Sequence, residues 1–454
     1  MNPVVRELGV PPAVLRRLAA RLPAHYPMLL DSAAEGPLSR TSVLVAEPRA
    51  ALWLDAEGQL GAEGIAIRGN TFFTALESWW LAEREATSNA HAELPFTGGW
   101  AIYLGYEMAQ EVEPRLRLPR ATLPWRAFAL RAPGALVHDR TRQRVIAVAE
   151  ADSADLLDRL EADAYRAAQE PDASDDGLRV KSIGEEDPDA YLERVRRAKE
   201  YVRAGDIYQT NLSRPWHVEV ERDPDVAALY NRLCTTNPAP FAALAQWRGA
   251  AIISSSPERL VRLEGGRIDT RPIAGTRPRS RRRGDDIAQM TALAAHPKER
   301  AEHIMLIDLE RNDLGRVCEA GTVRVDEFMT IESYAHVHHI VSNLSGVLRP
   351  DVTPIEALRA VFPGGTITGV PKFRCMQIIA ELEGVGRGAY TGSLGYLNRN
   401  GTMDLNILIR TMTLMGRKIE FRAGAGIVAD SEPQRELAET RAKARGLLAA
   451  FDVT

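Results

Sequence analysis

The sequence predicts an α+β fold built on antiparallel β-sheets. Strand-like runs are grouped as hairpins, and the helical segments lie between these groups instead of following each single strand. No internal repeat is visible that would favour a solenoid or a propeller. The apolar fraction of 45% and the charged fraction of 26% are typical of a globular protein with an ordinary core.

The length of 454 residues allows two or three average domains or one large one. The clearest boundary lies between Ala168 and Pro188, where the chain is acidic, contains prolines and has few large apolar side chains. We therefore predict an N-terminal region over residues 1–170, an exposed linker over 171–187 and a C-terminal region over 188–454.

The N-terminal region is expected to combine a helix with strands. Residues 1–23 have the pattern of an amphipathic helix with arginines, and they lack the unbroken apolar stretch of a signal peptide. Strand-like runs follow at Ser42–Pro48 and Arg144–Glu150.

The C-terminal region contains more recognisable elements. Pro188–Arg203 is a predicted helix because Leu192, Val195 and Val202 fall near one face, and Gly205 can supply the left-handed position after its end. The other predicted elements are the strands Ala250–Ser254, Gly392–Leu397 and Ile419–Ala423, a hairpin over Leu263–Ile268 that turns on Gly265 and Gly266, and the helices Ala301–Leu309 and Glu432–Phe451.

Charge and cysteine content exclude several classes of protein. The net charge of −4 gives no support to a nucleic-acid surface. The three cysteines, Cys234, Cys318 and Cys375, are far apart, which argues against a disulfide framework or a structural zinc site and favours a reducing compartment. No stretch approaches the roughly 20 apolar residues that span a bilayer. We expect a cytoplasmic protein without a membrane anchor.

Two pairs of acidic residues have a spacing that suits a metal site. Glu299 and Glu302 are three apart at the start of one predicted helix, as are Glu436 and Glu439 on another, so each pair would share a helical face. If the two faces were opposed, the oxygen ligands would suit Mg²⁺; on solvated helices the same pairs would have no function. Lys443, one turn beyond Glu439, is either its surface partner or a cation that reaches a substrate carboxylate.

Two glycine-containing segments are possible anion-binding loops. Gly424, Ala425 and Gly426 follow a predicted strand, and their backbone N–H groups could face an anion or form a tight turn. Residues 363–369 form a similar loop, but no Gly-Lys-Ser/Thr follows, so nucleotide hydrolysis lacks support. His338 and His339 are either buried structural histidines or proton carriers.

Several longer motifs together resemble those of the chorismate-utilising enzymes. This family contains anthranilate synthase component I, aminodeoxychorismate synthase component I, and isochorismate and salicylate synthases. The motifs that carry the resemblance are SPER (256–259), PIAGTRPR (272–279), DLERND (308–313), PGGTITGVPK (363–372), IRT (409–411) and GAGIVADS (424–431). The resemblance implies a large fold of antiparallel sheets packed with outer helices, formed by two intertwined subdomains, with 188–454 as the chorismate-binding catalytic region.

The resemblance also implies the roles of individual residues. Residues matching Glu302, Glu436 and Glu439 hold Mg²⁺, which binds the ring carboxylate of chorismate. Glu258 matches the general acid that protonates the departing C4 hydroxyl, and His339 matches a histidine that handles protons near the ring. The remaining implied positions are Thr276 among the catalytic residues and Gln209, Tyr390, Arg410, Gly424, Ala425, Gly426 and Lys443 around the substrate.

Three features bear on which family member this chain is most similar to. Isochorismate and salicylate synthases have a water-activating lysine where this chain has Gln209, so a member that uses ammonia is expected. MLLDSA (28–33), SVLVAEP (42–48) and PFTGGWAIYLGYEMA (95–109) look most like aminodeoxychorismate synthase component I, which aminates C4 of chorismate for 4-aminobenzoate and folate synthesis. This is the leading expectation.

Ala274 favours a different member of the family. Many aminodeoxychorismate synthases carry a lysine at this position that is thought to attack C2, and alanine cannot attack anything. Anthranilate synthases carry the PIAGT sequence found here and add ammonia at C2, so anthranilate synthase component I for tryptophan synthesis is the alternative.

The resemblance further implies a partner and a second pocket. Ammonia is expected from a glutaminase subunit on a separate chain, because no Cys-His-Glu triad is visible in this sequence. Leu29, Ser32, Pro240 and Phe241 match the walls of a tryptophan pocket in relatives.

Overall fold

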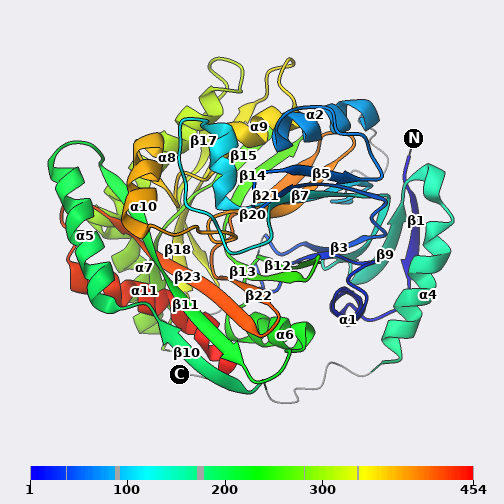
Figure 1. Ribbon diagram of the computed structural model, residues 1–454, viewed down its shortest axis with the longest axis horizontal. Helices are drawn as coiled ribbons and strands as arrows, with labels where there is room; N and C mark the ends of the chain where they lie inside the picture. Colours follow the sequence, from blue (N-terminus) through cyan, green and yellow to red (C-terminus); the bar gives the residue numbers. More distant parts are fainter. Residues whose placement is uncertain are drawn as a thin grey trace.

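Two large β-sheets form the centre of the computed structural model, which describes residues 2–36, 38–86, 93–170, 178–280, 282–334 and 337–452 (Figure 1). Every strand pairing within these residues is antiparallel. The predicted α+β fold with antiparallel sheets and outer helices is therefore confirmed.

The first sheet has 12 strands among the described residues. Along the sheet these are β1 (Val4–Leu8), β9 (Arg144–Ala149), β8 (Gly134–Asp139), β3 (Thr41–Ala46), β2 (Met28–Asp31), β12 (Phe241–Trp247), β13 (Ala250–Ser256), β22 (Thr411–Met415), β23 (Lys418–Ile427), β11 (Gln209–Val220) and β10 (Val180–Glu185), with β19 (Gly369–Val370) also paired to β11.

The second sheet has 11 strands among the described residues. Along the sheet these are β16 (Ile273–Pro278), β18 (Val337–Val347), β15 (Arg267–Arg271), β14 (Arg259–Glu264), β21 (Met403–Asn406), β20 (Ser393–Asn398), β6 (Gly99–Leu104), β7 (Trp125–Ala132), β4 (Ala50–Asp55) and β5 (Leu60–Glu63), with β17 (Arg324–Ser333) also paired to β18.

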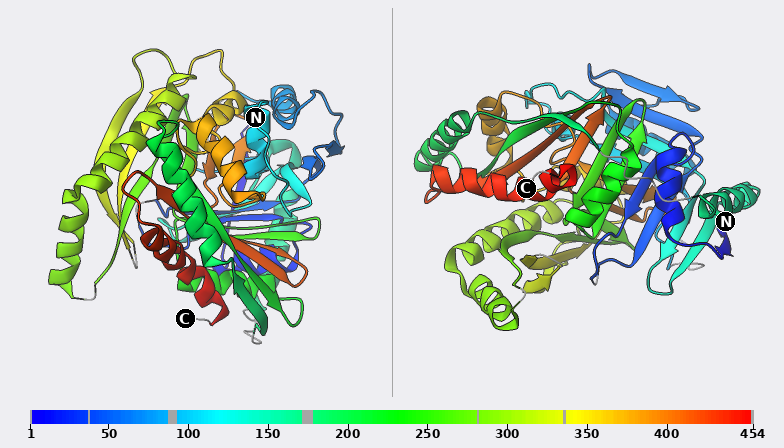
Figure 2. Two further views of the ribbon diagram at one scale, coloured as in Figure 1. Left: turned by 60° about the vertical axis from the view of Figure 1, so that its left-hand side comes forward. Right: turned by 90° about the horizontal axis from the view of Figure 1, so that it is seen from below.

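The helices cover the outer faces of the two sheets (Figures 1 and 2). They are α1 (Ala13–Arg21), α2 (Phe72–Glu83), α3 (Ala109–Val112), α4 (Leu156–Ala168), α5 (Pro188–Arg203), α6 (Val226–Thr236), α7 (Arg283–Ala295), α8 (Pro297–Gly315), α9 (Pro354–Val361), α10 (Lys372–Glu383) and α11 (Pro433–Leu448). None of the described helices is long and apolar enough to cross a membrane.

The sheets pack face to face over part of their area. Strand β3 illustrates why: Val43 and Val45 lie in the core between the sheets, whereas Leu44 lies in the core that packs against α1 and α4. This alternation is the two-residue period of a strand that is buried on both faces. Two further clusters pack α2 and α9 on the second sheet, and α5 and α10 on β11 and β23.

The predicted regions 1–170 and 188–454 are intertwined, because both contribute strands to each sheet. Residues 180–185 of the predicted linker form β10, which pairs with β11 at one edge of the first sheet. Residues 171–177 of that linker lie outside the described residues. The N-terminal helix prediction needs a correction: only Ala13–Arg21 is helical, and Val4–Leu8 forms β1 because β9 provides a partner for its backbone.

A buried ion cluster around Glu383 joins α10 to the first sheet. Its carboxylate accepts hydrogen bonds from Arg387 at 2.6 Å, from Arg422 at 3.0 Å and from the backbone N–H of Ser213 at 2.8 Å. Burial alone would raise the pKa of Glu383, but Arg387 and Arg422 outweigh this effect and hold it at about 2.

Glu383→Gln is expected to destabilise the fold by roughly 3–5 kcal/mol, because it leaves two buried guanidinium groups without their anion. The stabilisation from Glu383 is fully present above the pKa of an unfolded glutamate and is lost as the pH falls toward about 2. Urea unfolding at pH 7 measures the loss. Glu381→Gln on the same helix is the control, since Glu381 forms an exposed ion pair with Arg197 and should cost under about 1 kcal/mol. Equal effects of the two changes would contradict the prediction.

Candidate active site

The candidate acid Glu258 lies just beyond the end of β13 and is only 4% exposed. Burial raises the pKa of Glu258 to about 7, although the hydroxyl of Thr366, the backbone of Ile273 and the charges of Lys443 and Arg410 oppose the rise. A carboxyl with this pKa keeps its proton at neutral pH for much of the time, and it can then donate that proton to a leaving group. The structure thus gives Glu258 the environment that an acid requires.

Gln209 and Glu302 are brought together from β11 and α8. Nε2 of Gln209 donates a hydrogen bond to Oε1 of Glu302 at 2.9 Å. A Cβ atom at Gly426 would lie 2.4 Å from that Nε2 atom, so any larger residue would displace the glutamine. The glycine is required by this close approach.

The segment Gly424, Ala425 and Gly426 is not a loop, which corrects the sequence expectation. It continues β23, and its residues pair with Ser213, Leu212 and Asn211 of β11. Among the described residues, β23 is no longer paired with β22 beyond Phe421, so residues 424–426 pair only with β11 and the opposite edge of this segment is not used by the sheet. Whether its backbone N–H groups face an anion stays a prediction. The glycine at 424 also provides space, since a Cβ atom there would lie 2.7 Å from the hydroxyl oxygen of Tyr390.

Lys443 pairs with Glu439, as its spacing allows, and also contacts β23. Its Nζ atom forms an ion pair with Glu439 at 2.7 Å, one turn earlier on α11. The same atom donates a hydrogen bond to the backbone oxygen of Gly424 at 2.9 Å. The ammonium group is thereby held over β23, on the side where Tyr390 reaches the strand.

Helix α11 lies opposite the yellow-green helices (Figure 2), and Glu302 of α8 is near enough to Glu439 of α11 for their charges to interact. Burial raises the pKa of Glu302, and the negative charges of Glu299 and Glu439 raise it further. Glu436 is 7% exposed. Glu299 forms an ion pair with Arg277 at 3.1 Å.

These carboxylates do not form a closed metal cage. Among the residues that the structure describes, no three His, Cys, Asp or Glu side chains are gathered closely enough to hold a metal ion. The donor chemistry nevertheless fits Mg²⁺, since every candidate ligand is a carboxylate oxygen. To bind the metal, the carboxylate of Glu439 would have to give up its ion pair with Lys443.

His339 lies on β18, opposite Thr276 of β16, and Ala274 is paired with Ile340 on the same two strands. Burial lowers the pKa of His339 to about 3, with Arg410 contributing to the decrease. The imidazole is therefore neutral at physiological pH, and its low pKa makes it a weak base. Ala274 is 7% exposed, and the side chain of Thr276 lies outside the described residues.

Arg410 supplies a positive charge that the described residues do not neutralise. It has a left-handed backbone with φ of +51° and is half-buried. Burial lowers its pKa, and the nearby Glu258 opposes that effect. Within the described ranges, no side-chain hydrogen bond or ion pair occupies its guanidinium group, which leaves it available to an anion.

Buried polar atoms without hydrogen-bond partners line the same space. Among the described residues these include Oε1 of Gln209 and Oδ1 of Asn211. Such atoms are costly unless a ligand or water satisfies them. Arg410 and Lys443 would attract an anionic group, and the unpartnered oxygens could accept hydrogen bonds from donors on the same ligand.

The predicted tryptophan-pocket residues only partly come together. Ser32, Pro240 and Phe241 line a cavity of about 90 Å³ that also touches Arg259 and Tyr396. Leu29 lies instead in the core on the opposite face of β2, and Leu30 takes its place in the cavity wall.

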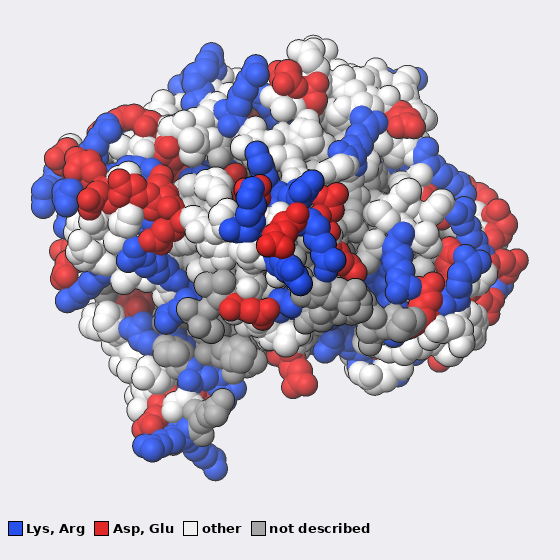
Figure 3. All heavy atoms as spheres, turned by 60° about the horizontal axis from the view of Figure 1, so that its bottom comes forward, with Lys and Arg blue, Asp and Glu red and all other residues white. Residues whose placement is uncertain are grey.

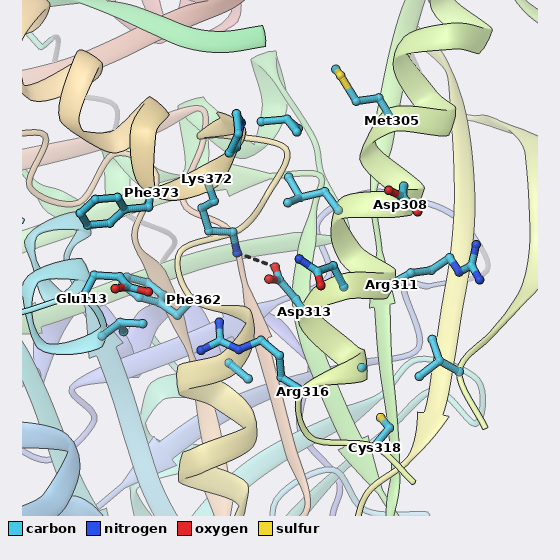
Figure 4. A pocket seen from close by; sticks show the side chains of 18 of the residues that line it. Glu113, Met305, Asp308, Arg311, Asp313, Arg316, Cys318, Phe362, Lys372 and Phe373 are labelled. Carbon is cyan, nitrogen blue, oxygen red and sulfur yellow. Dashed lines mark hydrogen bonds and ion pairs between the residues drawn. The ribbon is translucent and has the colours of Figure 1, made fainter. Parts of the chain in front are cut away.

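The sequence did not single out Asp313 and Lys372 as a pair, although both lie in motifs. They line a cavity of about 770 Å³ between α8, α9 and α10, and Figure 4 shows Lys372 reaching across to Asp313. Because the two residues are 59 positions apart, no local sequence pattern indicated that they form a pair.

The chain belongs to the family of chorismate binding enzymes, whose sequence model matches residues 28–449. It is 37% identical to anthranilate synthase component 1 of Thermus thermophilus, over 98% of this chain and 96% of that protein. It is 43% identical to an anthranilate synthase component I-like protein of Synechocystis sp., over 81% of this chain and 75% of that protein. The crystal structure of anthranilate synthase component I from Streptococcus pneumoniae matches with a TM-score of 0.79 and 32% identity, over 91% of this chain and 93% of that chain.

Proposed function

We propose that this chain is the chorismate-aminating component of an anthranilate synthase, which adds ammonia at C2 and eliminates pyruvate to give anthranilate. The observation that carries the proposal is Ala274, which lies on β16. C4 amination through a covalent adduct needs an amine side chain at this position, and alanine has only a methyl group. The relatives named above support the same choice. The leading expectation from the sequence, amination at C4, is therefore replaced by its alternative.

Gln209 supports ammonia as the nucleophile. Its Nε2 atom is held by Glu302, while its Oε1 atom is buried and has no hydrogen-bond partner among the described residues. An amide oxygen can accept a hydrogen bond from ammonia and so orient its lone pair, but it is too weak a base to activate water.

Chorismate carries two carboxylates, and the pocket offers two ways to bind them. We assign one carboxylate to Arg410, beside Tyr390 and Lys443. We assign the other to Mg²⁺ held by Glu302, Glu436 and Glu439, which would supply the Lewis-acid charge that fixes the ring. Glu258 then donates its proton to the C4 hydroxyl, which leaves as water, and His339 remains neutral near the ring.

A glutaminase on a separate chain is the proposed source of ammonia, and free ammonium should replace it.

Figure 3 shows acidic and basic side chains interspersed over one face of the molecule, so that face has no single-sign patch of the kind that binds nucleic acid.

The purified chain, incubated with chorismate, MgCl₂ and ammonium chloride, is expected to produce anthranilate, detected by its fluorescence and by mass spectrometry. Anthranilate should appear without any added lyase, and EDTA should prevent it. Accumulation of aminodeoxychorismate, converted to 4-aminobenzoate only when a lyase is added, would contradict C2 amination. A chain that leaves chorismate unchanged under these conditions would contradict the proposed function altogether.

A further inference from the structure

A cavity of about 620 Å³ lies on the outer face of the first sheet, and none of the candidate active-site residues lines it. It is enclosed by helix α1, the start of helix α6 and the ends of strands β2, β3 and β8. Its charged lining consists of four arginines and two aspartates: Arg16, Arg17, Arg21, Arg140, Asp31 and Asp225. Positive side chains therefore outnumber negative ones around the cavity.

The floor of this cavity is a row of polar side chains on three neighbouring strands. Ser42 and His138 are opposite one another on β3 and β8, and Oγ of Ser42 donates a hydrogen bond to Oδ1 of Asp31 on β2 at 2.7 Å. Because side chains alternate along a strand, this row shares its face with three leucines of the core that packs against α1: Leu29, Leu44 and Leu136. The face thus changes from apolar to polar at the cavity.

Two polar groups of the lining are not satisfied by the protein. Nε2 of His138 is buried and has no hydrogen-bond partner among the described residues. In the same part of the chain, no carboxylate pairs with the guanidinium group of Arg140, whose side chain donates to the backbone oxygen of Ser32 at 2.6 Å. Such groups are costly unless water or a ligand satisfies them.

The positive charge of Arg140 acts on the floor of the cavity. Burial lowers the pKa of His138, and Arg140 lowers it further, while Asp31 and Asp139 oppose the decrease. A cation close enough to disfavour the charged imidazole would favour an anion in the same place.

The two carboxylates of the lining are already occupied by other groups. Asp31 forms an ion pair with Arg16 at 2.8 Å, so its negative charge is balanced within the wall. Asp225 accepts hydrogen bonds from two backbone N–H groups at the start of α6, at 2.8 and 3.3 Å. Neither carboxylate neutralises Arg140, whose remaining N–H groups are available to a ligand.

We propose that this cavity is a binding site for a small oxyanion, a carboxylate or a phosphate group, held by the guanidinium group of Arg140 above the polar floor of Asp31, Ser42 and His138. A guanidinium group binds either kind of oxyanion through two parallel hydrogen bonds. The site is separate from the chemistry proposed above, because its lining shares no residue with the candidate active site.

Arg140→Gln is expected to weaken the binding of inorganic phosphate by at least about 10-fold, because it removes a charged hydrogen-bond donor from the cavity. Isothermal titration calorimetry, with chloride as the balancing anion at constant ionic strength, measures the binding. Arg142→Gln is the matched control, since Arg142 is two residues further on, is 57% exposed and pairs with Asp139 at 3.7 Å. It removes the same charge and should leave the affinity unchanged.

Chemical modification of the unmodified chain locates the bound anion without any substitution. Phenylglyoxal reacts with arginine side chains, and peptide mass spectrometry gives the rate at Arg140 and at Arg142 separately. At a phosphate concentration of about ten times the Kd, the reaction of Arg140 should slow by at least about fivefold, because the site is then mostly occupied. The rate at Arg142 should not change. Sodium acetate in place of phosphate tests the carboxylate, and protection of Arg140 by either anion supports the site.

Equal weakening by the two arginine substitutions, or equal protection of Arg140 and Arg142, would mean an adventitious ion only and would overturn the inference. Absence of protection of Arg140 by both anions would overturn it as well. Thermal melting checks that each variant is folded. Because chorismate consumption is not a readout of these experiments, their failure would leave the proposed function intact.

Discussion

Glu258→Gln is expected to lower kcat for chorismate consumption by about 10²–10⁴-fold. Glutamine preserves the size and the hydrogen-bonding capacity of the side chain, but it cannot donate a proton to the departing C4 hydroxyl. Chorismate binding should change little, because the carboxylates of the substrate are assigned to Arg410 and the metal. Turnover is measured by anthranilate fluorescence, and binding by isothermal titration calorimetry in the presence of Mg²⁺.

The pH profile gives a second readout of the same role. Because an acid must be protonated to act, kcat/KM of the unmodified chain should decline as the pH rises past about 7, the pKa to which burial raises Glu258. Glu264→Gln, at the exposed end of β14, is the control and should retain both the rate and the decline. Undiminished turnover in Glu258→Gln, or a residual rate with the same decline, would remove Glu258 from the acid role.

Local sequence patterns predicted the helices and hairpins whose backbone conformation is determined by residues close together in the chain. Helix α5 has the predicted bounds, and Gly205 follows it with a φ of +78°, as a helix C-terminus requires. The hairpin of β14 and β15 turns on Gly265 and Gly266, both with positive φ. Residues 4–8 were misjudged because their strand conformation depends on β9, about 140 residues further along the chain.

The candidate site was accessible from the sequence mainly through motifs. The spacing of Glu436, Glu439 and Lys443 correctly placed them on one helix, but it left open whether Lys443 faced solvent or the site. Its contact with Gly424 comes from a different segment and could not be derived from spacing.

The metal site leads to the second large effect. Glu302→Gln is expected to weaken binding of Mn²⁺, used as a paramagnetic probe for Mg²⁺, by at least about 10–100-fold, since even groups that only orient a ligand have effects of this size. The free Mn²⁺ signal in electron paramagnetic resonance, recorded with and without chorismate, measures this without any turnover. Because the metal is proposed to hold a substrate carboxylate, chorismate binding should weaken in parallel.

Glu299→Gln is the matched control, because Glu299 lies three residues earlier on α8 and pairs with Arg277. If the metal were bound by any carboxylate near the start of α8, both changes would weaken Mn²⁺ binding equally. If the site is formed by Glu302 with α11, only Glu302→Gln should do so, and Glu439→Ala should resemble it. An unaltered Mn²⁺ titration in Glu302→Gln would contradict the assignment even if the variant had lost activity, since activity also depends on the hydrogen bond between Gln209 and Glu302.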